Sequence, residues 1–273
     1  MTTVQKIIKY LALAFAIFLC VSILSGICGA LYYVSGFFGG HTSDELSEHV
    51  IDSDFTNLTV DISAAELEIK TGDAFGIETN HRYLTYKENG DTLEIRETKP
   101  FFASHHGMKV IVTVPKGTVF NSAAIHAGAG SVRIDELSAG SLNIQLGAGE
   151  FEAGHLDALH QAEIDGGAGS VTIRGGYLNN ADIDMGVGEF NLTGELDGNS
   201  SMDYGVGETN LALAGTADDY RIELDKGIGE AWLDGKKMTD GSVYGSGSRR
   251  LEIDGGIGEL HITFIPKPEQ NRI

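Results

Sequence analysis

Acidic side chains recur at near-constant spacing along the second half of the chain, and they are the residues best placed to do chemistry. We name two sets: the Asp column (Asp165, Asp184, Asp203, Asp225 and Asp254) and the Glu column (Glu150, Glu189, Glu208, Glu230 and Glu259). Clustered carboxylate oxygens are ligands for hard cations such as Ca²⁺, and a strongly negative surface attracts basic peptides. We therefore predict that the columns bind a cation or a cationic partner. The alternatives are that they cap backbone amides or simply stay solvated.

The chain carries no recognisable catalytic motif. It has no G-x-S-x-G nucleophile elbow, no phosphate-binding P-loop and no H-E-x-x-H zinc motif. Carboxylates are so frequent that no glycosidase pair stands out. The nine histidines lack metal-ligand spacing, so we predict no firm metal site. Together these absences predict no enzyme activity and no cofactor. A calcium-binding nonapeptide repeat is excluded as well, because Val171 stands at the Asp position of that motif.

An internal repeat defines the elements that would hold these columns. The tetrapeptide Gly-x-Gly-Glu/Ser begins at Gly128, Gly147, Gly167, Gly186, Gly205, Gly227 and Gly256, at intervals of 19 to 29 residues. A degenerate copy, Ser63–Glu66, precedes them. Glycine permits the positive φ or the close backbone approach that a sharp corner between strands needs. Each repeat is therefore predicted to form a strand, a glycine corner, a second strand and a polar return.

Apolar and polar residues alternate on both sides of each corner, which is the signature of strands with one buried face. Units of this length bury their apolar faces only by stacking. We therefore predict an all-β fold: a single-stranded β-solenoid (β-helix) of about seven or eight rungs with a β-rich N-terminal cap. The residue between the two glycines enlarges from Ala129 to Ile257, which predicts an inward-facing ladder.

In this arrangement both columns face outward on successive rungs. Carboxylates stacked about 4.8 Å apart repel each other by roughly 1 kcal/mol per pair even in water, so a cationic ligand would offset a real cost. Trp232, the single tryptophan, is predicted at an outward position. It is either an exposed contact or covered by the long return at 234–250, which carries Lys236, Lys237, Arg249 and Arg250 and is expected to protrude.

An uncharged apolar segment near the N-terminus predicts a membrane anchor. No charged residue occurs from Tyr10 to Gly40, and about 20 apolar residues suffice to cross a bilayer as a helix. Lys6 and Lys9 precede the segment and every acidic residue follows it, which places the N-terminus in the cytoplasm. We predict one transmembrane helix over residues 10–34, with the remainder outside the cytoplasm at the cell membrane. A cleaved signal peptide is the alternative.

The composition suggests five segments. We predict a cytoplasmic stub and anchor at 1–40, a linker at 41–56, the N-terminal cap at 57–120, the solenoid at 121–265 and a tail at 266–273, with cap strands near Thr92–Thr98 and Lys109–Val114. The net charge of −20 repels nucleic acid. Both cysteines, Cys20 and Cys28, lie in the apolar segment, so no disulfide framework is available beyond it.

The stretch Lys109–Gly117, followed by units such as Gly-Ala-Gly-Ser-Val-Arg-Ile, resembles the bacterial putative-adhesin families of envelope-associated β-solenoid proteins, over residues 54–264. The resemblance implies the same fold and an envelope context, and it supplies no catalytic motif. We predict a membrane-anchored, adhesin-like binding or scaffolding protein of the bacterial cell envelope. It would contact an envelope component, a cationic peptide or a partner protein along one solenoid face. The alternatives are an accessory component of an envelope-stress sensing system and, less favoured, a carbohydrate-active enzyme.

Overall fold

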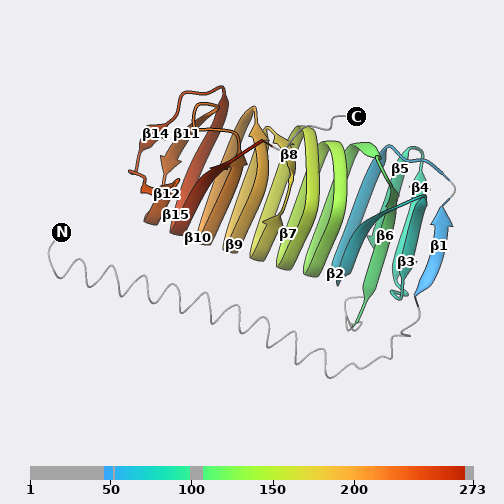
Figure 1. The fold of residues 1–273 in the computed structure, drawn as a ribbon. Helices are drawn as coiled ribbons and strands as arrows, with labels where there is room; N and C mark the ends of the chain where they lie inside the picture. The colour runs from blue at the N-terminus through green and yellow to red at the C-terminus, as the bar shows by residue number, and fades with distance from the viewer. Residues whose placement is uncertain (1–45, 52, 99–106, 268–273) are drawn as a thin grey trace, which may run out of the picture. The chain divides into compact units, whose positions relative to one another are not determined.

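The computed structural model describes residues 46–51, 53–98 and 107–267, which belong to one compact unit of the chain. Their strands join in a single sheet (Figure 1), and no helix occurs among them, which confirms the predicted all-β class. The strands are β1 (Ser47–Ile51), β2 (Asn57–Gly72), β3 (Phe75–Thr79), β4 (Leu84–Asn89), β5 (Thr92–Glu97), β6 (Lys109–Pro115), β7 (Val119–Ile173), β8 (Gly176–Asn179), β9 (Ala181–Asp197), β10 (Asn199–Ala214), β11 (Tyr220–Asp225), β12 (Ile228–Leu233), β13 (Lys236–Lys237), β14 (Ser242–Tyr244) and β15 (Arg249–Ile265).

The predicted membrane anchor at 10–34 lies outside the described residues. Within the described ranges, no helix has the length and apolar character needed to cross a membrane.

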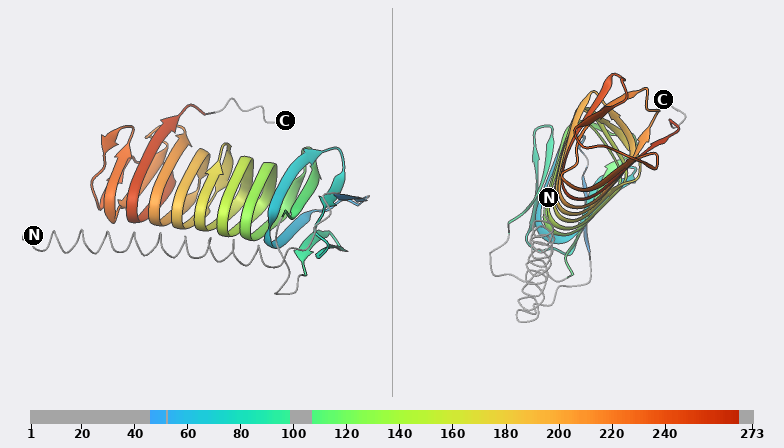
Figure 2. Two further views of the ribbon diagram at one scale, coloured as in Figure 1. Left: turned by 90° about the horizontal axis from the view of Figure 1, so that it is seen from below. Right: turned by 90° about the vertical axis from the view of Figure 1, so that its left-hand side faces the viewer.

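The long strands stack in parallel and in matching register, so equivalent positions of successive repeats lie side by side. β2 pairs with β7, β7 with β9, β9 with β10 and β10 with β15. Seen along the stack, successive turns superpose (Figure 2). The alternating apolar residues form one continuous core, in which Ile125, Ile144, Ile164 and Ile183 are fully buried. The pairing follows the phase of the repeat because each turn buries its apolar face only against its neighbours.

The glycine corners lie directly upon one another. A Cβ on Gly147 or Gly186 would overlap the carbonyl oxygen of the first glycine of the preceding corner. Positive φ falls on the second glycine of each corner, from 128° at Gly130 to 158° at Gly258. Gly227, although it is the first glycine of its corner, also has a positive φ, at 58°. First glycines are therefore needed for close approach, and second glycines for both approach and backbone conformation.

The residue between the two glycines does not enter the core, so the predicted inward-facing ladder is wrong. These residues are partly exposed, and Ile228 is 40% exposed: Ala129, Ala148, Ala168, Val187, Val206, Ile228 and Ile257. The corner interrupts the alternation of the strands. The last inward position is the residue before the first glycine, such as Leu146, which packs against the core.

The last turns do not stack in the order of the sequence. β10 pairs with β15, and β15 pairs in turn with β11 and β12. The corner at Gly256 therefore lies between the corners at Gly205 and Gly227 (Figure 1). This corrects the predicted order of the Asp column, which runs in space as Asp165, Asp184, Asp203, Asp254 and Asp225.

Antiparallel strands close both ends of the stack. At one end β3 pairs with β1 and β6, and β4 pairs with β5; at the other, β13 pairs with β12 and β14 with β11. Such strands cover edges that would otherwise pair with other chains. β5 and β6 coincide with the predicted cap strands. The return expected to protrude instead contains β13, β14 and the start of β15, and the Arg249 side chain is only 13% exposed.

Candidate binding surface

The Asp column forms in register along the stack. Its members are Cα partners on neighbouring strands: Asp165 with Asp184, Asp184 with Asp203, Asp203 with Asp254 and Asp254 with Asp225. All five residues are exposed, because each follows a buried residue by one position on an alternating strand. Parallel pairing therefore places five carboxylates in a line at about the spacing of paired strands, 4.8 Å.

Little around the Asp column offsets its charge. The outward position two residues earlier is mostly acidic as well and forms a second row: Glu163, Asp182, Ser201, Glu252 and Glu223. In the part of the chain that the structure describes, no lysine or arginine forms an ion pair with an Asp-column carboxylate. Asp225 accepts a 3.4 Å hydrogen bond from the Gly227 amide, as the amide-capping alternative predicts.

Crowding affects the ionisation of the two central carboxyls. Partial burial raises the pKa of Asp184, and the charges of Asp182 and Asp165 raise it further. Partial burial also raises the pKa of Asp203, to which the charges of Asp184 and Asp254 add. Both carboxylates are therefore less stable in their charged form than in water, and a bound cation would relieve this.

A shallow groove of about 520 Å³ runs along the same line. Its lining comprises Asp165, Asp184, Asp203 and Asp254, together with Met185, Tyr204 and the corner residues Gly167, Gly186, Gly205, Gly255 and Gly256. The glycines contribute no side chains, so the aspartates are the charged groups of the lining. The groove has the size of a ligand site, and its chemistry suits a positively charged ligand.

The Glu column also forms along the stack. Glu189 pairs with Glu208, Glu208 with Glu259 and Glu259 with Glu230. Ser170 is the partner of Glu189 on the other side. Glu150 occupies the same position at the preceding corner and is exposed.

Unlike the Asp column, Glu189, Glu208 and Glu259 have side-chain partners two residues further along their strands. Asn191 Nδ2 donates to Glu189 Oε1 at 2.8 Å, and Asn210 Nδ2 donates to Glu208 Oε1 at 3.0 Å. His261 Nε2 lies 3.7 Å from Glu259 Oε2. In the terminal turn, Lys237 Nζ lies 2.6 Å from Glu230 Oε1. The two columns were predicted alike from the sequence, but among the described residues side-chain nitrogens bond to the Glu column and not to the Asp column.

Beside the Glu column, Trp232 lies at the end of a row of Cα partners on neighbouring strands, which consists of Thr172, Asn191, Asn210 and His261. Its ring is stacked on that of His261, with centroids 4.5 Å apart and planes inclined by 8°. On the other side, Trp232 pairs with Lys237 of β13, which belongs to the long return. Trp232 is therefore half-buried and partly covered, which favours the second of the two predicted alternatives.

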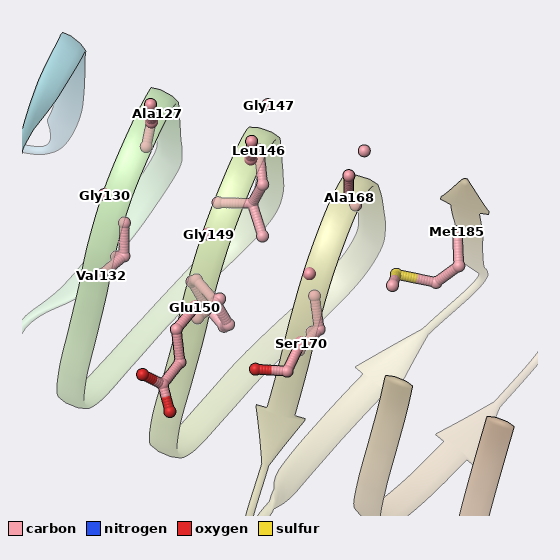
Figure 3. A pocket seen from close by; sticks show the side chains of 17 residues that line it. Ala127, Gly130, Val132, Leu146, Gly147, Gly149, Glu150, Ala168, Ser170 and Met185 are labelled. Atoms are coloured by element: carbon pink, nitrogen blue, oxygen red, sulfur yellow. The ribbon is translucent and has the colours of Figure 1, made fainter. Parts of the chain in front are cut away.

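A small hollow at the corners of β7 is lined by residues such as Leu146, Ala168 and Met185 (Figure 3). It arises where Gly166 has no side chain and the Met185 sulfur takes that place. Its volume of about 20 Å³ has room for one water molecule, so it is not a ligand site.

The described residues contain no group of three or more His, Cys, Asp or Glu side chains placed to hold a metal ion. Carboxylates lined up along a stack point side by side and do not converge on one point, as a calcium site of six to eight oxygens requires. The geometry therefore gives no support to calcium as the ligand of the columns.

A row in which basic and acidic side chains alternate along the stack was not predicted from the sequence. The two oxygens of Glu152 lie 3.4 Å from Arg133 Nη2 and 2.5 Å from Arg174 Nη2, on neighbouring turns. The hydrogen bond and charge of Arg174, followed by those of Arg133, lower the pKa of Glu152. The separations of these residues, 19 and 22, match the repeat interval, and that match is the signal that could have revealed the row.

A buried pair at the degenerate corner was also missed. His81 Nε2 lies 3.2 Å from Glu97 Oε1, with side chains 0% and 1% exposed. Glu97 Oε2 accepts the amide hydrogens of Ser63, at 2.7 Å, and Ala64, at 3.4 Å. Burial alone would raise the pKa of Glu97, but these amides and His81 together lower it. Nothing local in the sequence indicates this pair, because its members come from three separate segments.

The family model described as Toastrack DUF4097 matches residues 55–249, which span the stack from β2 to the start of β15. The chain belongs to the Toastrack DUF4097 family. Membership confirms the predicted kinship with adhesin-like solenoid proteins. Among curated proteins, none matches this Toastrack chain.

Several solved structures are similar to the Toastrack chain. A "putative cell adhesion protein" from Clostridium sporogenes is 12% identical, covers 81% of this chain and 99% of its own, and has a TM-score of 0.39. A "putative adhesin" from Parabacteroides distasonis is 15% identical, with coverages of 82% and 98% and a TM-score of 0.38. A "putative lipid binding protein" from the same species is 13% identical, with coverages of 82% and 98% and a TM-score of 0.30.

Proposed function

We propose that this Toastrack protein is a binding or scaffolding module of the bacterial cell envelope, and that its groove takes a cationic, extended ligand such as a basic peptide segment. The observation that carries the proposal is the line of four aspartates along the groove, none of which forms an ion pair with a lysine or arginine among the residues that the structure describes. Four carboxylates on consecutive strands span about 14 Å. A chain with several positive groups matches that length, whereas a single ion does not.

The proposal includes the location predicted from the sequence. A transmembrane helix over 10–34 would hold a solenoid of seven or eight rungs outside the cytoplasm, where basic segments of envelope proteins are accessible. The uncharged apolar stretch and the positive charges of Lys6 and Lys9 support this orientation. Protease added to intact cells should remove the solenoid while sparing the anchor. Full protection of the solenoid would contradict the proposed location.

The proposed role is binding and not catalysis. The sequence contains none of the nucleophile-elbow, P-loop or zinc-protease motifs, and the groove presents a row of like charges, which suits binding of an opposite charge.

Calorimetric titration of the full chain with octalysine at low salt tests this function. The Asp184→Asn/Asp203→Asn variant should lose about tenfold or more in affinity, since each exposed ion pair contributes up to about 1 kcal/mol and two are lost together. The matched control is Glu189→Gln/Glu208→Gln, which removes the same charge from the same two strands, β9 and β10. An equal loss in both variants would mean that octalysine senses net charge alone, and the groove would be rejected as the site.

A further inference from the structure

The last strand of the chain lies between strands that precede it in sequence. β15 has β10 on one side and β11 and β12 on the other (Figure 1). Its apolar residues Leu251, Ile253, Leu260 and Ile262 are buried in the common core. The turn made by β11 and β12 must therefore stand two strand spacings from β10, with β15 filling the gap.

The two edges that β15 separates are complementary to each other. Val206 of β10 and Ile228 of β12 are both Cα partners of Ile257, and Glu208 and Glu230 are both partners of Glu259. The three corners have nearly the same sequence, Gly-Val-Gly-Glu at Gly205 and Gly-Ile-Gly-Glu at Gly227 and Gly256. Without β15, β12 could pair with β10 in the register that every earlier turn uses.

The path of the chain leaves β15 free to withdraw. The connection between β10 and β11 bonds to both ends of β15: the Gly215 amide donates to the Ile265 carbonyl at 2.9 Å, and the Arg249 amide donates to the Asp219 carbonyl at 3.2 Å. The connection thus passes between the two ends of β15 and does not enclose the strand. Withdrawal requires no threading of the chain through a loop.

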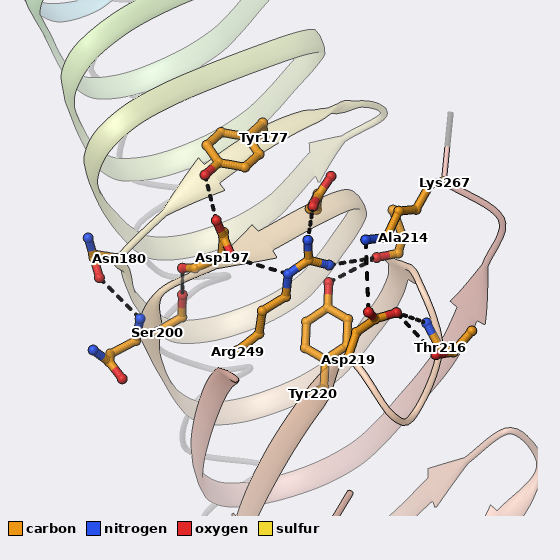
Figure 4. Close-up of polar contacts among 12 residues, drawn as sticks. Tyr177, Asn180, Asp197, Ser200, Ala214, Thr216, Asp219, Tyr220, Arg249 and Lys267 are labelled. Atoms are coloured by element: carbon orange, nitrogen blue, oxygen red, sulfur yellow. Dashed lines mark hydrogen bonds and ion pairs between the residues drawn. The ribbon is translucent and has the colours of Figure 1, made fainter. Parts of the chain in front are cut away.

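Arg249, the first residue of β15, forms a polar latch that holds the strand in place (Figure 4). Its guanidinium bonds Glu195, lies 3.1 Å from Asp197 Oδ1, and stands over the Tyr220 ring at 5.4 Å. Asp197 also accepts a 2.7 Å hydrogen bond from the Tyr177 hydroxyl. Arg249 thereby ties β15 to the end of β9, the strand beyond β10.

We propose that β15 is a removable turn of the stack, and that the C-terminal end of the solenoid has two states. In the first, β15 is inserted and latched by Arg249. In the second, β15 is withdrawn and β12 closes on β10 in the register of the earlier turns. The inserted state is the ground state because it buries the apolar face of β15 and pairs Glu195 and Asp197 with a cation.

Disulfide trapping in the full chain distinguishes the two states. In a background with Cys20→Ser and Cys28→Ser, Val206→Cys/Ile228→Cys can form a bond only after β15 leaves, since two strand spacings, about 9.6 Å, exceed the Cα separation that a disulfide spans. The control pair, Val206→Cys/Ile257→Cys, joins Cα partners of the inserted state. The control should cross-link at once under mild oxidation, and the test pair slowly.

Weakening the contacts of Arg249 should speed up disulfide formation in the test pair and leave the rate in the control pair unchanged or lower. We expect Arg249→Ala to raise the cross-linking rate of the test pair at least tenfold at urea concentrations where far-ultraviolet circular dichroism remains native. Arg249→Lys, which keeps one charge, should have a smaller effect and serves if Arg249→Ala fails to fold. Cross-linking of the test pair only on global unfolding, or at a rate independent of residue 249, would overturn the proposal.

Discussion

The Asp column and the Glu column are built by the same stacking on either side of the same corners, yet their surroundings differ. Glu189 and Glu208 receive hydrogen bonds from asparagines two residues further on. Asp184 and Asp203 have acidic or hydroxyl neighbours two residues earlier, and their pKa values are raised by partial burial and by like charges.

Because the turns stack in register, a side chain at one position of the repeat recurs on successive turns, and so does any repulsion between its copies. A row of carboxylates with donors is a stable surface. A row without donors is a surface that a cation would stabilise. The Glu column lies only a few residues from the Asp column on the same strands and has side-chain donors. The repeat therefore does not by itself require a row of carboxylates without such donors.

A substitution at a glycine corner that both columns share should change the stability most. Gly207 lies between Asp203 and Glu208, has a φ of 152°, and would place a Cβ on the carbonyl oxygen of Gly188. We expect Gly207→Ala to lower the free energy of unfolding by about 3 to 5 kcal/mol, since it adds backbone strain to a clash within the stack. Urea denaturation measures this change.

Gly235 provides the matched control for this substitution. It has a φ of 72°, and a Cβ added there would meet no other atom within 4 Å. Gly235→Ala should therefore cost only about 1 to 2 kcal/mol, from backbone strain alone. Equal losses at both glycines would show that close stacking at the corner contributes nothing.

Removing a like charge beside the Asp column should stabilise the protein, and replacing a donor beside the Glu column with a carboxylate should destabilise it. Asp182→Asn removes a charge that raises the pKa of both Asp184 and Asp203, and we expect a gain of about 0.5 to 1 kcal/mol. Asn191→Asp removes the donor to Glu189 and adds a charge beside it, and we expect a loss of about 1 kcal/mol. Thermal and urea unfolding of both variants measure the two effects, and changes of the same sign would contradict this expectation.

Acidification should remove the cost of the Asp column. Because the folded-state pKa values of Asp184 and Asp203 are raised, the folded chain binds more protons than the unfolded chain between the ordinary aspartate pKa and the raised value. The free energy of unfolding therefore falls as pH rises through that window. Asp184→Asn/Asp203→Asn should stabilise the protein at pH 7, and the gain should vanish below the window. A gain that is constant with pH would contradict this cause.

Salt should have the smallest effect. Raising NaCl from about 0.1 M to about 1 M shortens the screening length from about 10 Å to about 3 Å. We expect the parent to gain about 0.5 kcal/mol more than Asp184→Asn/Asp203→Asn does, because screening relieves repulsion that the variant has already lost. Urea midpoints at the two salt concentrations give this difference, and identical gains would assign the salt effect to other charges.

The sequence predicted the corners, the buried positions and the register of both columns, because the alternation recurs in the same phase relative to each glycine corner, as at Ile125, Ile164 and Ile253. It did not predict which turn follows β10, since the corners at Gly227 and Gly256 have the same four residues. The irregular intervals of 22 and 29 residues were the sole hint. Asn191 and Asn210, which donate to the Glu column, are 19 residues apart, and this match to the repeat interval is the signal that could have predicted them.

Contacts between distant segments were beyond the pattern. Arg249 lies more than 50 residues from Glu195 and Asp197, and no periodicity links them, so Arg249 was assigned to a protruding loop. The inward-facing ladder failed for a local reason: close backbone approach at two glycines interrupts the alternation on which the prediction rested.

In the proposed function, the carboxylates of the Asp column, and not those of the Glu column, take the cationic ligand. Carbon NMR of the full chain labelled at aspartate and glutamate carboxyls, titrated with acid in the absence and presence of octalysine, tests it directly. We expect raised pKa values for Asp184 and Asp203 in the free protein, which fall when octalysine binds, with little change at Glu189 and Glu208. Unchanged aspartate pKa values, or larger changes at the two glutamates, would contradict it.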